Sequence, residues 1–123
     1  MTVCEIWADN GILRVEWSTP VSSEEMLGCF MRVAQMVNNS AQPVDIVFDI
    51  SGAGHIPVDA PMLAVRSGFL NHPNTRNVAV VGLDYWAQIL TNVASRTAGK
   101  SIICYRSYQE AAHAMYLCEL SLT

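Results

Sequence analysis

The sequence predicts one α/β domain over residues 1–123, built from a mixed five-stranded sheet with four helices mainly on one face. Three observations lead to this fold class. The turn signal Asp9-Asn10-Gly11 separates two stretches of alternating apolar and polar residues, as in a β-hairpin. The sequence VDIVFDI at 44–50 alternates like a buried strand and leads into a glycine-punctuated loop. After that loop, helix and strand patterns alternate, which indicates parallel strands joined by helical crossovers.

The composition excludes several classes of protein. With 51% hydrophobic and 15% charged residues, the chain is unlike a disordered protein. Its net charge is −4 and its seven Lys and Arg residues are scattered, so it lacks the basic surface that binds nucleic acid or anionic membranes. The first residues contain neither a signal-peptide pattern nor an apolar run that could span a membrane, so we expect a cytoplasmic protein.

The four cysteines, at positions 4, 29, 104 and 118, form no C-x-x-C pair and have no spacing typical of a zinc site. Thiols stay reduced in the cytoplasm that we expect for this chain. We therefore predict buried free thiols, with no metal site and no disulfide framework.

The N-terminal half is predicted to form the hairpin, a helix and the central strand. Strands at 3–8 and 12–18 make the hairpin, and in the second strand the odd-numbered residues share the buried face. Ser22 is the expected N-cap of a helix that ends at 38–40, since Glu25 completes a capping box. The methionines of this helix are expected to fill the core rather than form a binding surface: Met26, Met31 and Met36.

Similar signals define the C-terminal half. Asp59 is the expected N-cap of a helix that ends before Pro73. Ser107 and Glu110 form a second capping box, at the start of a helix that runs to about residue 120. Between these helices we expect strands at 76–82 and 100–105, joined by a helix that opens at 83–84 and closes at Gly99.

The connections predict where the helices lie. Right-handed crossovers that step in one direction place their helices on one face of the sheet, so the other face should meet solvent or a partner. The fourth and fifth strands nevertheless carry apolar residues on both faces, and we therefore expect a homodimer or another protein partner on part of the open face. These residues are Val78, Ala79, Val80, Val81, Ile102 and Ile103.

Several short motifs occur in this order: the hairpin, the turn D-I-S-G at 49–52, the break N-H-P-N at 71–74 before VAVVG, and the final YRSYQEAAHAMYL. Together they resemble the SpoIIAA-like branch of the STAS superfamily, which includes the anti-sigma-factor antagonists. The resemblance covers nearly the whole chain. It implies an α/β domain with four helices that acts through contacts with proteins or small ligands, without chemistry of its own.

The family's regulatory feature is a phosphorylatable serine at the N-terminus of the helix that follows the central strand. The matching residues here, H-I-P-V-D-A-P at 55–61, include no serine or threonine. Asp59 lies near the modified position, where a carboxylate favours a helix N-terminus. We expect Asp59 to act as an N-cap rather than to imitate a phosphorylated serine, and we do not expect a kinase-operated switch.

The candidate site lies beyond the carboxyl end of the central strand, where open α/β sheets bind ligands. Its residues come from the loop after this strand and from the starts of two neighbouring helices: Asp49, Ser51, Gly52, His55, Asp59, Asp84 and Tyr85. We predict that they bind a ligand or partner, with no catalytic or metal-binding role. No cofactor is expected, because Pro57 replaces the third glycine of a dinucleotide fingerprint.

The leading functional hypothesis is therefore a non-enzymatic regulatory or ligand-binding domain. An alternative is a module that binds a lipid or another apolar small molecule between the helices and the sheet, favoured by the Met-rich first helix and Trp86. A third hypothesis is a small enzyme that uses Asp49 and His55 for acid and base chemistry.

Overall fold

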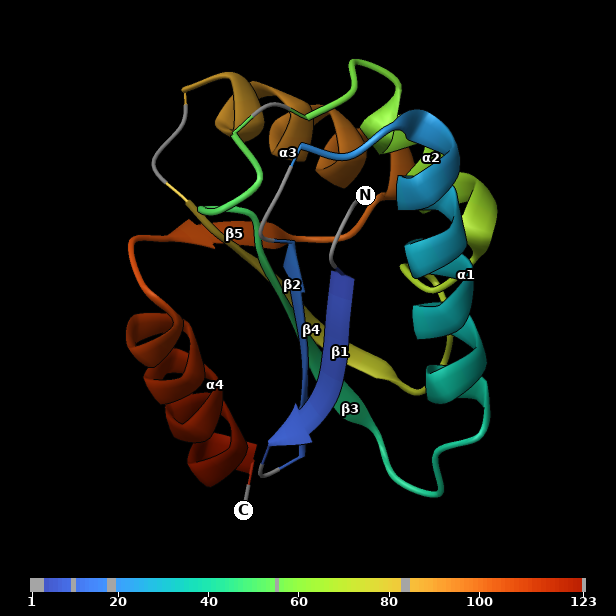
Figure 1. The fold of residues 1–123 in the computed structure, drawn as a ribbon. Coiled ribbons are helices and arrows are strands. Elements are labelled where there is room, and N and C mark those ends of the chain that lie inside the picture. Colours follow the sequence, from blue (N-terminus) through green and yellow to red (C-terminus); the bar gives the residue numbers. More distant parts are fainter. Residues whose placement is uncertain (1–3, 10, 18–19, 55, 83–84, 123) are drawn as a thin grey trace.

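The computed structural model describes residues 4–9, 11–17, 20–54, 56–82 and 85–122. Within these ranges, five strands and four helices follow one another in the predicted order (Figure 1). The strands are β1 (Cys4–Asp9), β2 (Ile12–Trp17), β3 (Val44–Asp49), β4 (Thr75–Val81) and β5 (Ile102–Tyr105). The helices are α1 (Ser23–Asn38), α2 (Ala60–Ser67), α3 (Tyr85–Ala98) and α4 (Tyr108–Leu122). Helix α2 ends earlier than predicted because Gly68 takes the left-handed conformation of a C-cap, with φ 87°.

The strands form one sheet in the order β1-β2-β3-β4-β5, so β3 lies at its centre as predicted. Strands β2 to β5 run parallel, and β1 pairs antiparallel with β2, with Asp9 opposite Ile12. The predicted hairpin pairing is thus confirmed. In the turn, Gly11 has φ 83°, as a type I′ turn requires, whereas Asn10 lies outside the described residues.

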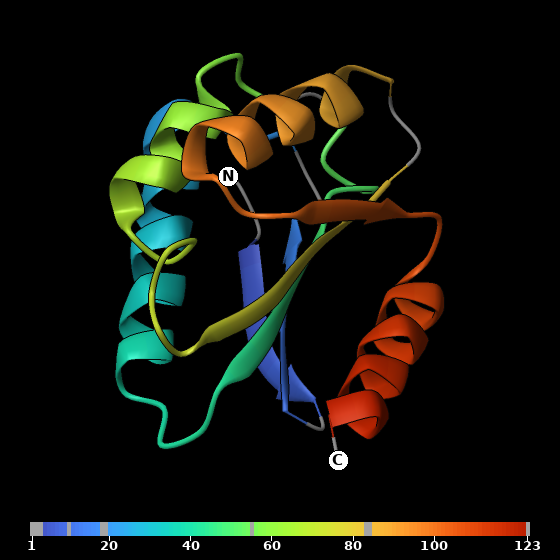
Figure 2. The same cartoon turned by 180° about the vertical axis from the view of Figure 1, so that it is seen from behind.

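The main core lies between the sheet and a layer formed by α1, α2 and α3 (Figures 1 and 2). Each of these helices connects two neighbouring parallel strands, so right-handed crossovers place all three on the same face. Aromatic rings meet at the centre of this core. Trp17 stacks on Phe48, and Phe30 and Phe69 pack against them, with ring centroids 5.3 to 6.0 Å apart.

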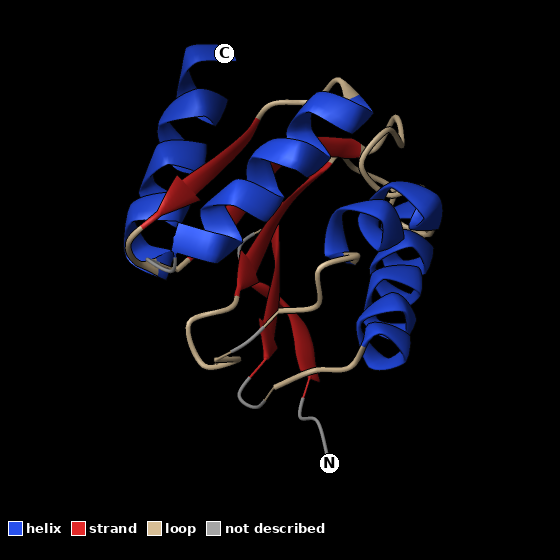
Figure 3. Ribbon diagram, turned by 90° about the horizontal axis from the view of Figure 1, so that it is seen from above, coloured by secondary structure: helices blue, strands red, loops and turns tan. Residues whose placement is uncertain are grey.

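Helix α4 lies on the opposite face of the sheet, which corrects the expectation of an open face (Figure 3). Its Ala111 and Met115 form a second buried cluster with residues of the sheet: Ile12, Val47, Ala79 and Val81. In the described chain α4 leads to no further strand, so the crossover rule that positions the other helices does not apply to it. The apolar residues that predicted a partner are therefore covered in part by the chain itself.

Polar caps fix where α1 and α4 begin. Glu25 N donates to Ser22 Oγ at 3.2 Å, and Ser22 N donates to the Glu25 carboxylate at 3.1 Å, which confirms the first capping box. In α4, Glu110 N donates to Ser107 Oγ at 3.2 Å. The Glu110 carboxylate, however, accepts from Arg106 N, one residue before the predicted partner.

The methionines of α1 divide between core and surface. Met26 is buried as expected, but Met31 and Met36 are 54% and 37% exposed. The prediction that all three fill the core is wrong for these two, because only one stripe of a helix can face the sheet.

A buried ion pair that the sequence patterns do not signal joins β3 to β4. Arg76 donates to Asp45 from Nε to Oδ1 at 3.0 Å and from Nη2 to Oδ2 at 2.8 Å, and Asn77 Nδ2 adds a bond of 2.9 Å. The Asp45 side chain is only 3% exposed. These donors compensate the carboxylate, which explains how a charged residue occupies a fully buried strand.

Cys29 is disulfide-bonded in the structure, whereas Cys104 is a free thiol. The prediction of buried free thiols is therefore wrong for Cys29, whereas Cys104 is free as predicted but only partly buried. Cysteine spacing could not reveal the bond, because a disulfide depends on which segments the fold brings within reach of each other.

Candidate functional site

Asp49 and Ser51 form the polar end of the central strand. Oδ1 of Asp49, the last residue of β3, accepts hydrogen bonds from the Ser51 backbone N–H at 3.1 Å and from the Ser51 hydroxyl. Such contacts to a residue two positions on are typical of Asp at turns. The Asp49 side chain is only 11% exposed, whereas Ser51 is exposed. Two of the predicted site residues are thus in direct contact.

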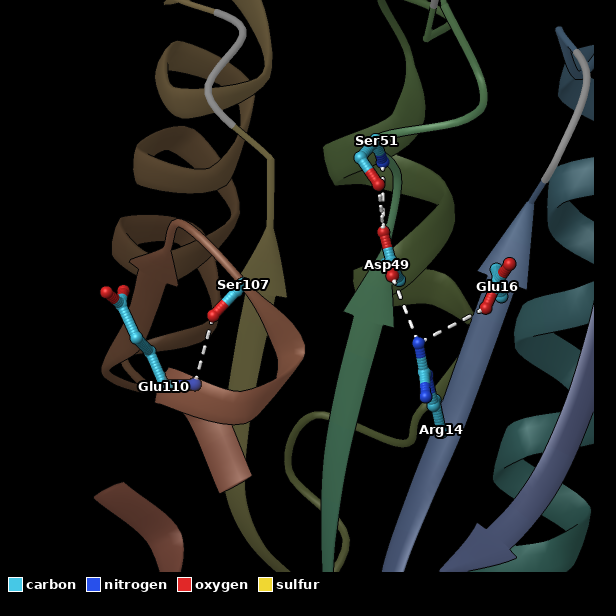
Figure 4. Close-up of polar contacts among 6 residues, drawn as sticks. All are labelled: Arg14, Glu16, Asp49, Ser51, Ser107 and Glu110. Carbon is cyan, nitrogen blue, oxygen red and sulfur yellow. Dashed lines mark hydrogen bonds and ion pairs between the residues drawn. The ribbon is translucent and has the colours of Figure 1, made fainter. Parts of the chain in front are cut away.

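Arg14 of β2 compensates the charge of Asp49. Its Nη2 atom lies 3.5 Å from Asp49 Oδ2 and 3.4 Å from Glu16 Oε2 (Figure 4). The guanidinium also lies over the ring of Tyr108 in α4, 4.0 Å from its centroid. Sequence reasoning did not include Arg14 in the site, but the parallel register that places Glu16 opposite Asp49 brings it there.

Asp59 lies at the N-cap position of α2 but does not cap the helix. Its backbone has φ −88° and ψ 5°, outside the extended region from which a carboxylate reaches the first helical N–H groups. Instead, its Oδ1 accepts a hydrogen bond of 2.7 Å from Ser23 Oγ, in the first residue of α1. The predicted capping role is therefore wrong, and the carboxylate links the starts of two helices.

The predicted site residues do not form one cluster. Asp49 contacts Arg14, which packs on Tyr108 of α4, while Asp59 bonds to α1 on the opposite side of the sheet. The remaining candidates are Gly52, exposed in the loop, Tyr85, whose side chain is not described, and His55 and Asp84, outside the described residues. The structure thus joins Asp49 with Ser51 and separates Asp59 from them.

The described residues offer few other polar arrangements. No group of three or more His, Cys, Asp or Glu side chains in them could hold a metal ion. None of the helices in the described ranges has the length and apolarity to cross a bilayer. The acidic side chains that the structure places at the carboxyl end of β3 are engaged with Arg14.

An apolar cavity of about 80 Å³ lies between the helix layer and the sheet. Its walls come from the core face of the sheet and from α1, α2 and α3, and include Trp17, Phe48, Val80, Met26, Ala64 and Ala94. None of the described residues that line it carries a charge. This is where sequence reasoning placed an apolar ligand as an alternative function.

The sequence contained a signal for this cavity that pattern analysis did not use. Ala60 and Ala64, four residues apart on α2, and Ala94 on α3 are buried and line the cavity. Small side chains at core positions of a helix leave space unless larger neighbours fill it. Of the features cited for an apolar ligand, Met26 lines the cavity, whereas the Trp86 side chain is not described.

One solved structure shows which known fold this chain resembles. It is the crystal structure of an uncharacterised protein from the DUF3478 family of Shewanella loihica, with a SpoIIAA-like fold. The TM-score is 0.63 and the sequence identity 13%, and the match covers 91% of each chain. The chain therefore has a SpoIIAA-like fold, which confirms the predicted fold resemblance. No protein-family model and no curated protein matches the sequence.

Proposed function

We propose that this chain is a non-enzymatic SpoIIAA-like domain that binds a small apolar molecule between its helix layer and its sheet. The observation that supports this function is the cavity of about 80 Å³, whose described lining is apolar apart from Trp17 and Thr91. Cavities with apolar walls stay dry and bind molecules such as benzene or xenon. A ligand here would contact both layers of the fold at once.

The size of the cavity limits the ligand. An engineered apolar cavity that binds benzene measures about 150 Å³, so this one takes the end of a chain, or a small ring for which side chains of the lining move. A ligand that binds the folded chain and not the unfolded one stabilises the fold by mass action, so occupancy of this space is expected to raise the melting temperature.

The proposal assigns no chemistry to the polar residues at the carboxyl end of β3. The Asp49 carboxylate accepts hydrogen bonds from Ser51 and forms an ion pair with Arg14. Both contacts are explained by the stability of the fold. An enzyme based on Asp49 would need a second group in reach of a reacting atom. The proposed function therefore depends on the cavity and on the protein surface, and not on a reaction at Asp49.

Ligand binding can be tested with cyclopentane as a probe on the purified protein labelled with ¹⁵N and ¹³C-methyl groups. We expect saturable shifts of the methyl signals of lining residues and a higher melting temperature at saturation. Native mass spectrometry of the same preparation is expected to show a retained small molecule where purification has not removed it.

Two alanine substitutions provide a matched comparison. Ala64→Leu adds three carbons beside the cavity and is expected to abolish the cyclopentane shifts. Ala112→Leu adds the same atoms in α4, on the other side of the sheet, and should leave them unchanged. Folded wild-type protein that shows no saturable shift, or an Ala64→Leu variant that binds as the wild type does, would contradict the proposed function.

Two further expectations belong to this proposal, a homodimer and a cytoplasmic location. Ile103 on β5 is 52% exposed and Tyr116 on α4 is 58% exposed, and these two residues provide apolar surface for a second copy. Light scattering at high concentration should report twice the chain mass, and a monomer would refute the dimer. Fractionation of the source cells tests the cytoplasmic location, and recovery of the protein outside the cytoplasmic fraction would refute it. The disulfide at Cys29 is the observation that opposes this expectation, because such bonds are typical of oxidising compartments.

A further inference from the structure

Trp17 places a polar atom in an apolar part of the core. Its side chain is 1% exposed, and its indole Nε1–H has no hydrogen-bond partner among the described residues. The ring itself is fixed, since it stacks on Phe48 with centroids 5.8 Å apart and meets Phe30 at 87°. Buried donors in native cores almost always have an acceptor, because nothing else replaces their lost hydration.

The surroundings of the indole do not provide a strong acceptor. The face of a phenyl ring such as Phe30 accepts only a weak N–H···π contact. A buried water molecule needs two to four polar partners. Among the described residues that line the cavity beside Trp17, Thr91 is the other one with a polar side chain.

We propose that the ligand of this cavity is uncharged and carries one hydrogen-bond acceptor, such as a carbonyl or ether oxygen, which binds the Nε1–H of Trp17. This inference rests on the proposed function and specifies the chemistry of its ligand. A carboxylate does not fit, because no charged residue belongs to the described lining. The apolar part of the ligand packs among the side chains of the cavity, and the acceptor oxygen of the ligand lies at the end nearest Trp17.

Binding requires a small movement at the indole edge. The Nε1 atom exposes less than 1 Å² in the structure, so a neighbouring side chain has to shift before an oxygen reaches it. Met26 lines the same cavity and is buried. Its unbranched side chain is flexible and can adopt another rotamer at low cost, so among the lining residues it is the one best suited to make room for the ligand.

The test compares cyclopentanone with cyclopentane, which have the same ring size and differ in one acceptor oxygen. The chain has three tryptophans, so ¹⁵N-labelled protein gives three indole signals, and Trp17→Phe assigns the one from Trp17. We expect saturating cyclopentanone to move the Trp17 Nε1–H signal downfield, as formation of a hydrogen bond does. Cyclopentane should shift the methyl signals of the lining without this downfield change.

Affinities provide a second measurement. Loss of the hydrogen bond in Trp17→Phe should reduce the preference for cyclopentanone over cyclopentane by about tenfold. Phe69→Leu also enlarges the cavity but keeps the indole, so its preference should stay within about twofold of the wild type. Each preference is the ratio of the affinities of one protein for the two ligands. A change in cavity size affects both affinities in a similar way and therefore largely cancels in the ratio.

The outcomes separate this inference from the function on which it rests. Saturable binding of both rings with an unmoved Trp17 indole signal would overturn the inference and leave the proposed function intact. Binding of neither ring would overturn both. Should Trp17→Phe fail to fold, Trp7→Phe and Trp86→Phe assign the other two indole signals, and the remaining one belongs to Trp17. Its shift in the wild-type protein then decides, with Ala64→Leu as the control that lacks the space for the probe.

Discussion

The guanidinium of Arg14 lies 4.0 Å from the centroid of the Tyr108 ring, and so connects the second strand to the first residue of the last helix. The same guanidinium forms ion pairs with Asp49 and Glu16. Helix α4 has no crossover to hold it against the sheet, in contrast to the other three helices. Its position therefore depends on side-chain contacts, of which this one is at its N-terminal end.

Tyr108→Ala is expected to lower the free energy of unfolding by about 2 kcal/mol, because it removes the cation–π contact and the burial of the ring. Amide hydrogens of α4 should exchange faster in this variant than in the wild type. Urea unfolding and hydrogen exchange measure the two effects. Tyr116→Ala on the same helix is the control, since this residue is 58% exposed and should change stability by less than about 0.5 kcal/mol. If Tyr108→Ala and Tyr116→Ala lower the free energy of unfolding equally, the contact between Arg14 and Tyr108 does not hold α4 in place.

Asp45→Asn is expected to destabilise the fold by about 2 kcal/mol or more. Breaking a buried ion pair leaves its partner uncompensated and costs about 3–5 kcal/mol, and partial exposure of Arg76, 28%, reduces that cost here. Urea unfolding of the variant measures it. Glu16→Gln provides the comparison, because its pair with Arg14 is more exposed and should contribute less than about 1 kcal/mol. A loss for Asp45→Asn no larger than that for Glu16→Gln would refute the structural role of the pair.

Most of the fold could be predicted because its signals are local. The hairpin turn, the capping box of Ser22 and Glu25, and the apolar stretch of β3 each depend on residues close in sequence, and the structure has all three. The rule that crossovers are right-handed then predicted correctly that α1, α2 and α3 lie on the same face of the sheet. The position of α4 could not be predicted in this way, because in the described residues it leads to no further strand, and packing of residues such as Ala111 decides its face.

The candidate site was less predictable because its contacts are long-range. Asp49 and Ser51 were identified from their position after the central strand, but Arg14 joins them only through the register between two strands. Asp59 was expected to cap α2, whereas its partner Ser23 is 36 residues away in sequence. The cavity forms because the side chains of three helices and the sheet do not fill the space between these elements. Its presence could not be predicted from any one segment of the sequence.

The contact between Ser23 and Asp59 predicts energetic coupling between α1 and α2. A double-mutant cycle with Ser23→Ala and Asp59→Ala should give a coupling energy of about 0.5–1 kcal/mol in urea unfolding, as expected for an exposed hydrogen bond to a carboxylate. Ser22→Ala, which removes the cap of α1, should cost about 1 kcal/mol and show no coupling with Asp59→Ala. If the effects of Ser23→Ala and Asp59→Ala simply add, the contact has no role in holding the two helices together.

The disulfide at Cys29 predicts the number of reactive thiols. One disulfide uses two of the four cysteines, so oxidised protein denatured in guanidinium should titrate two thiols, and reduced protein should titrate four. Reduction should also lower the melting temperature, because the cross-link restricts the unfolded chain and typically stabilises a domain by about 2–4 kcal/mol. Cys29→Ala should melt at a similar temperature with and without reductant, whereas Cys104→Ala, which removes a free thiol, should keep the full response to reduction. Four reactive thiols in protein purified without reductant would show that the bond does not form.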